Sequence, residues 1–145
     1  MLTLHQLESR INHLPSGQQD VIIEIHNIVA GISPNAHMRF SADGVAYYEG
    51  WRGGTIKGGL CIVSWSPRHP FMMAFGLGRF LPDPHHLLSG DQLAMRHYHF
   101  PEYEKIPWDA VTELIKAAQA FNPTLENTYI SALIREKPHQ SQQDQ

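Results

Sequence analysis

The sequence has a single cysteine among its 145 residues, Cys61, and this scarcity excludes two kinds of stabilising site. One thiol cannot form an intrachain disulfide, and a zinc site based on thiolates cannot be built from it. Cys61 lies in an apolar run that we expect to be a central strand. We therefore expect a buried core thiol at this position and not a catalytic nucleophile.

Basic side chains are also scarce, and they form no cluster. Eleven Lys and Arg residues stand against fourteen Asp and Glu residues, which leaves a formal charge of −3. Proteins that bind nucleic acid neutralise its phosphates with clustered Lys and Arg side chains. A nucleic-acid partner is therefore not expected.

Long apolar runs are missing as well. No stretch approaches the roughly 20 consecutive residues that a membrane-spanning helix requires. The first five residues also lack the basic start and the long apolar run of a signal peptide. We therefore expect a soluble cytoplasmic protein that has no membrane partner.

The sequence does contain helical periodicity at both ends. An apolar stripe from residue 4 to residue 14 ends at Pro15, and a second stripe runs from residue 21 to residue 32. Residues 3–6 and 16–19 resemble capping boxes before these two helices. Two further stripes occupy residues 108–121 and 125–133, and Pro107 suits the first position of a helix.

The middle of the chain has the short apolar runs and turn residues of a β-sheet. Strands are expected at residues 36–40, 45–49, 60–65, 71–77 and 95–100. The runs 60–65 and 71–77 are apolar on both faces, so they should lie centrally in the sheet. Five glycines occur in residues 50–59, which predicts an exposed, flexible hairpin loop there.

This order of elements predicts one α+β domain. Two N-terminal and two C-terminal helices should pack on one face of a mostly antiparallel sheet of about five strands. A chain of this length is most naturally a single domain, which we place at residues 1–137. Residues 138–145 are polar and are expected to form a disordered tail.

Several short motifs give the chain a family resemblance. They are Asn-His-Leu-Pro at 12–15, Ile-Ser-Pro-Asn-Ala at 32–36, Phe-Gly at 75–76, Leu-Ser-Gly at 88–90 before Met95 and Arg96, and Ile-Pro-Trp at 106–108. In their order and spacing the chain resembles the YdhG-like family of small bacterial proteins over roughly residues 4–121.

The resemblance implies a compact α+β fold, a cytoplasmic location and a protein that handles a ligand without catalysis. Some members of the YdhG-like family are described as frataxin-like iron chaperones, so the resemblance also implies iron as a candidate ligand. Frataxins present metal on an acidic helical ridge, whereas the first two helices expected here carry only three acids, Glu8, Asp20 and Glu24.

The histidines offer one candidate metal site. His97 and His99 are two residues apart on an expected strand, so their side chains should leave the same face. Two imidazoles can share a divalent metal ion, and His85, His86 or His69 could supply a third. The alternative is that these histidines are exposed or singly hydrogen-bonded, and this is the reading that we favour.

Arg96 is the second candidate. If Tyr98 and Phe100 face the core, then Arg96 should point inward and need an anionic partner. Glu49 or Asp43 would make an internal ion pair, which is the interpretation that we favour, while a ligand carboxylate or phosphate would make a binding site. A concave sheet face lined by Tyr48, Trp65 and Arg96 would form a small-ligand pocket.

Three hypotheses for function follow. The first is a non-enzymatic domain that binds a small ligand or a metal ion such as iron. The second is an interaction module, in which an uncovered sheet face binds another protein or forms a homodimer. An enzyme is the third and has the least support, because no Ser-His-Asp order is recognisable in the sequence.

Overall fold

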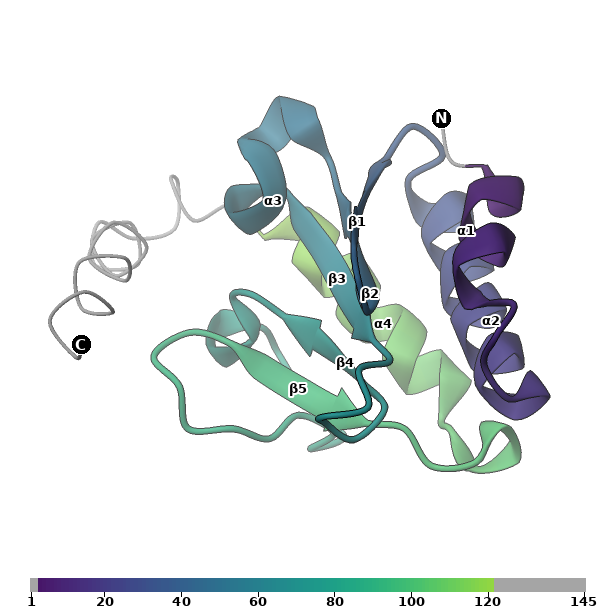
Figure 1. Cartoon of the computed structure of the whole chain (residues 1–145). Coiled ribbons are helices and arrows are strands. Elements are labelled where there is room, and N and C mark those ends of the chain that lie inside the picture. The colour runs from purple at the N-terminus through teal and green to yellow at the C-terminus, as the bar shows by residue number, and fades with distance from the viewer. Residues whose placement is uncertain (1–2, 122–145) are drawn as a thin grey trace, which may run out of the picture.

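A computed structural model describes residues 3–121 of the chain, and Figure 1 shows the arrangement of its elements. Three helices of two turns or more are α1 (Leu4–Ile11), α2 (Ser16–Ile32) and α4 (Trp108–Ala120). The strands are β1 (His37–Ser41), β2 (Gly44–Tyr48), β3 (Gly59–Ser64), β4 (Met72–Phe75) and β5 (Arg96–His99). The short helix α3 (Gly54–Lys57) and three 3-10 turns (Gly50–Arg52, Gly78–Phe80 and Tyr103–Lys105) complete the order.

The five strands form one antiparallel sheet in the order β1-β2-β3-β4-β5. Each strand pairs with the next along the chain, which is the usual arrangement of consecutive strands. β3 lies in the centre with β2 and β4 on its two sides, which confirms the prediction for the apolar runs 60–65 and 71–77.

Helices α1, α2 and α4 lie on one side of this sheet (Figure 1). Their apolar stripes are buried, with Leu7 and Ile11 on α1, Ile22 and Val29 on α2, and Ile115 on α4 all at most 1% exposed. The α+β class and the packing of two N-terminal helices and one C-terminal helix on a five-strand antiparallel sheet are thereby confirmed. The second C-terminal helix and the polar tail 138–145 lie outside the described residues.

The core fills the space between these helices and one face of the sheet. Val45, Val63 and Met73 pair across three neighbouring strands and point into it, each at most 1% exposed. Burial of one such side chain is worth about 1.5–3 kcal/mol, so this layer dominates the stability of the fold. Cys61, at 2% exposed, belongs to the same layer, and burial raises the pKa of its thiol.

The two predicted capping boxes are absent. Thr3 stands at the start of α1 and its side chain makes no capping hydrogen bond. α2 begins one residue earlier than a Ser16 cap would require, because the extended Pro15 occupies the cap position and Ser16 is already helical. Gln19 instead donates a hydrogen bond from Nε2 to the carbonyl oxygen of Leu14, at 2.7 Å.

The glycine-rich connection joins the antiparallel strands β2 and β3, which confirms the predicted hairpin, and it folds into the helical turns Gly50–Arg52 and Gly54–Lys57. The backbone turns at Gly53, whose φ of 111° is accessible mainly to glycine. Gly58 passes so close to Glu49 that an added Cβ would stand 2.1 Å from the Glu49 carbonyl oxygen. The positive φ of Gly53 and the close approach of Gly58 to Glu49 explain why glycines occupy these positions in an ordered segment.

Within the part of the chain that the structure describes, no helix combines the length and the apolar character that crossing a membrane requires.

Candidate functional site

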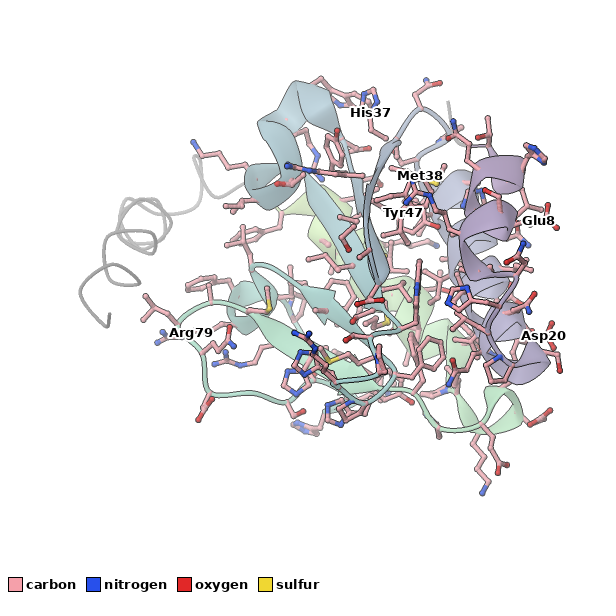
Figure 2. All side chains as sticks on the ribbon, in the orientation of Figure 1. Glu8, Asp20, His37, Met38, Tyr47 and Arg79 are labelled. Atoms are coloured by element: carbon pink, nitrogen blue, oxygen red, sulfur yellow. The ribbon has the colours of Figure 1, made fainter. Side chains whose placement is uncertain are left out.

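The sheet face opposite the helices carries the candidate site. Because strand side chains alternate between faces, residues that pair directly across strands share a face. One such row crosses the whole sheet on the uncovered side, from β1 to β5: Arg39, Ala46, Ile62, Ala74 and His97. Met38 and Tyr47, the neighbours of Arg39 and Ala46 along their strands, point to the other face, and Figure 2 shows them directed toward α1 and α2.

A cavity of about 210 Å³ opens on this uncovered face, and we call it the open-face cavity. Its floor is made by side chains of the row just described: Arg39, Ala46 and Ile62. Its walls come from three segments that are distant in sequence: residues 55–56 of α3, residues 76–77 after β4, and residues 93–95 before β5. Apolar side chains therefore surround most of its volume.

Two small residues leave the space for this cavity. Ala46 lies on a central strand where larger β-branched residues are more usual. Gly76 follows β4, and a Cβ added there would have no neighbour within 4 Å. The volume thus results from small side chains over the sheet and not from a gap between domains.

A shallower depression adjoins the cavity and shares Arg39, Thr55 and Ile56 with it. It continues to Tyr48 and to residues 53–57, which include Lys57. We call the cavity and this depression together the open-face groove. Arg39 lines both parts and so stands where the apolar part meets the polar part.

The groove has a positive electrostatic character. Among residues 3–121, its lining holds two cations, Arg39 and Lys57, and no carboxylate. The ion pairs among residues 3–121 join Arg52 to Glu49, His85 to Glu113 and Lys105 to Glu102, so Arg39 has no acidic partner in that part of the chain. An exposed guanidinium without a carboxylate is available to an anion from solution.

A buried polar network holds the α3 wall of the groove in place. Glu49 is 3% exposed and accepts hydrogen bonds from Ser33 Oγ (2.6 Å), from Gln119 Nε2 (3.0 Å) and from Arg52 Nε. Arg52 also donates to the carbonyl oxygens of Lys57 and Gly58, each at 3.2 Å. The network therefore links α2, β2, α3 and α4 around one carboxylate.

The Glu49 carboxylate is held in its charged form. Burial alone would raise the pKa of Glu49, but hydrogen bonds from Gln119, Ser33 and Arg52, together with the Arg52 charge, outweigh that effect. The pKa of Glu49 consequently lies below its ordinary value. The group is therefore ionised at neutral pH, and its negative charge is matched by Arg52.

The three residues that the sequence suggested for a ligand pocket do not come together. Tyr48 lines the groove, where its ring packs against His37 with 5.4 Å between centroids. Trp65 is 6% exposed and belongs to the core on the helix-covered face. Arg96 pairs with Phe75 at the edge of the sheet, away from both.

The internal ion pair expected for Arg96 is wrong. Its Nη1 donates to the carbonyl oxygens of Gln92 (2.6 Å) and Met95 (2.7 Å), and its candidate partner Glu49 is bound by Arg52 instead. The physical reason is the position of β5 at the edge of the sheet. From there the long side chain reaches the neighbouring connection, whose carbonyl groups compensate the charge without a carboxylate.

The histidine prediction is confirmed in one part. His97 and His99 do leave the same face of β5, and their rings stack with 4.8 Å between centroids. His85 lies 3.2 Å from Glu113 of α4, and His86 stands in a turn with φ of 53°. Residues 3–121 contain no group of three or more His, Cys, Asp or Glu side chains placed to hold a metal ion.

Sequence reasoning missed the residues that define the groove, above all Arg39 and Ala46. The alternation in residues 37–41 could have placed Arg39 opposite Met38 and Phe40, on the uncovered face. No comparable signal exists for residues 93–95, because nothing in an irregular connection shows where it crosses a sheet.

Comparison with protein-family models, with curated proteins and with solved structures finds no match to this chain. The resemblance to the YdhG-like family therefore stays a prediction from the motifs quoted above.

Proposed function

We propose that this protein is a binding domain that takes a small, largely apolar molecule into the open-face groove. The observation that carries the proposal is the open-face cavity of about 210 Å³ on the face of the sheet opposite the helices. An apolar engineered cavity of about 150 Å³ is large enough to bind benzene in another protein. The volume here suits a compound with one aromatic ring or a short branched chain.

The composition of the groove also fits this function. Small-molecule sites are mostly apolar and carry a few polar groups that orient the ligand. Here the apolar part is formed by Ala46, Ile62 and residues 93–95, and the polar groups are Arg39, Lys57 and Tyr48 at one end. We limit the proposal to binding because the described lining supplies no carboxylate, imidazole or thiol as a base or nucleophile.

A binding assay with a neutral probe tests the proposal. We expect 3-phenylpropan-1-ol to bind the native protein and to shift the amide resonances of Ala46, Ile62 and residues 93–95 in a ¹H–¹⁵N NMR titration. The variant Ala46→Phe should abolish these shifts, because its ring occupies the cavity floor. The matched control Ser41→Phe places the same ring on the same face of the sheet, but outside the groove, and should bind normally.

Two results would refute this function. One is the absence of saturable shifts with the native protein at millimolar probe. The other is an unchanged affinity in Ala46→Phe while circular dichroism shows that the variant is folded.

A self-association module is the second candidate, and one observation favours it. Trp51 is 62% exposed and Ile56 is 46% exposed, and Ile56 lines the groove. Large apolar side chains that are exposed to solvent and lie close together are a feature of protein–protein interfaces. A molar mass that rises with concentration in light scattering, and that falls to the monomer value in Trp51→Ser, would support this alternative.

Iron handling, which the family resemblance implies, would rest on His97 and His99. The stacked pair supplies two nitrogen donors, whereas stable sites for divalent metals use more ligands together with second-shell partners. Calorimetric titration with Fe²⁺, Zn²⁺ and Ni²⁺ tests this version. Stoichiometric binding that is lost in the His97→Ala, His99→Ala double variant would support it, and no uptake by the native protein would rule it out.

A further inference from the structure

We infer that the ligand of the open-face groove is a small organic carboxylate, held with its apolar part in the cavity and its carboxylate on Arg39. The inference rests on the proposed function and deepens it by naming the chemical class of the ligand. Three observations support it: the position of Arg39, the lack of an acidic partner for it, and the distribution of charge over the molecule.

The position of Arg39 defines where an anionic group would lie. Arg39 lines both the apolar cavity and the shallow depression, so this residue stands at the boundary between them. A molecule that fills the cavity therefore presents its other end to Arg39. The planar guanidinium matches a carboxylate with two parallel hydrogen bonds, which is a geometry that lysine cannot supply.

The surroundings of Arg39 favour an anion over a cation. Arg39 has no carboxylate within ion-pair distance among residues 3–121, and the other charged group of the groove, Lys57, has the same sign. Glu49, the acid next in sequence to Tyr48, is buried and neutralised by Arg52. An incoming carboxylate would therefore meet two positive charges and no negative one.

The distribution of charge over the molecule also favours an anionic ligand in the open-face groove. The protein carries a formal charge of −3, so a groove that holds only cations is not an average sample of its surface. The acids gather elsewhere: Asp20 and Glu24 of α2 lie beside Glu102, Glu104 and Tyr103. Figure 2 shows Asp20 on the helical layer, pointing away from the sheet. Separated charges of this kind direct an anion toward the positive face.

The size of the cavity limits the apolar part of the ligand. About 210 Å³ accommodates a phenyl ring or a chain of similar volume, with the carboxylate outside the cavity at Arg39. Tyr48 and Lys57 line the depression that shares Arg39 with the cavity. Arylalkanoates and short branched alkanoates are the compounds that fit this pattern.

A matched pair of probes separates the inference from the proposed function. The carboxylate 3-phenylpropanoate and the neutral 3-phenylpropan-1-ol share the same ring and chain, and differ only in the terminal group. Because a charge-assisted hydrogen bond is about twice as strong as a neutral one but is weakened by exposure, we expect about three- to tenfold tighter binding of the carboxylate at low salt. The preference should shrink as added salt screens the exposed charge.

Two arginine variants identify the group responsible. Arg39→Gln should remove the preference for the carboxylate, so that the two probes bind this variant with similar affinity. Arg68→Gln removes one positive charge from an exposed position outside the groove and should keep the preference. All titrations use the full chain and are followed by NMR or calorimetry.

The outcomes distinguish the two claims. If the native protein binds both probes equally, or if Arg39→Gln retains the preference, the carboxylate inference is overturned while the proposed function stands. If the native protein does not bind the alcohol, or if Ala46→Phe binds both probes as the native protein does, the proposed function falls and the inference falls with it. A preference that Arg39→Gln abolishes and Arg68→Gln preserves supports both.

Discussion

Replacement of Glu49 by alanine tests the buried network that supports the groove. Glu49 is 3% exposed and accepts hydrogen bonds from Ser33, Arg52 and Gln119. The alanine variant removes the acceptor of all three donors and leaves the Arg52 charge without its carboxylate. Removal of one partner from a buried ion pair costs about 3–5 kcal/mol, which is a large part of the 5–15 kcal/mol that stabilises a typical domain.

The magnitude expected here lies toward the lower end of that range, at about 3 kcal/mol. Arg52 is 19% exposed at its side chain and keeps its hydrogen bonds to the carbonyl oxygens of Lys57, Gly58 and Phe121, so its charge is not stranded. Glu49→Gln should cost less, about 1–3 kcal/mol, because it keeps one acceptor oxygen and loses the charge.

Urea denaturation followed by tryptophan fluorescence measures these changes. The control is Glu113→Ala, which removes an acid that is 61% exposed and that, within residues 3–121, pairs only with His85. That control should change stability by less than about 0.5 kcal/mol, as is usual for surface positions. A Glu49→Ala variant as stable as the control would show that the network does not stabilise the fold.

The same carboxylate predicts a dependence of stability on pH. The folded pKa of Glu49 lies below its ordinary value of 4.5, so the unfolded chain takes up a proton first as the pH falls. The contribution of Glu49 to stability is therefore complete above pH 4.5 and is lost as the pH falls through the lower, folded pKa. Glu49→Gln should lack this loss, and an equal acid sensitivity in both proteins would contradict the argument.

Two further predictions concern His26. His26 is 3% exposed and its Nδ1 lies 2.9 Å from the Tyr47 hydroxyl, so Tyr47→Phe should cost about 1–3 kcal/mol in urea denaturation by leaving a buried imidazole unpaired. Burial lowers the pKa of His26, so stability should fall as the pH drops below 6.5; a His26→Gln variant with the same slope would contradict this.

Sequence patterns were sufficient for the three long helices and the five strands, but not for the helical turns between β2 and β3. Apolar residues at helical spacing predicted the buried stripes of α1, α2 and α4, and two apolar runs predicted the central position of β3 beside β4. These predictions succeed because a helix or strand that buries one face has apolar residues at the spacing of that element. This spacing can be recognised within a single segment of the sequence. Helix ends were predicted less well, since Pro15 took the cap position that Ser16 was expected to fill.

The candidate site depended on information that no single segment contains. Arg39 and Arg96 stand in the two edge strands, β1 and β5, and only the register of the sheet shows that they lie on opposite faces. Arg96, on an edge strand, folds back onto the carbonyl groups of its own connection, while Arg39 reaches the groove beside Ala46 and Ile62.

The sequence by itself determined the three long helices, the five strands and the α+β class of residues 3–121, because those properties follow from local periodicity and turn residues. Only the tertiary structure decided that residues 93–95 and α3 wall in a cavity, and that Ser33 and Gln119 meet Glu49. These contacts join residues that are far apart along the chain, and their geometry is fixed by how the sheet, its connections and the helices pack together.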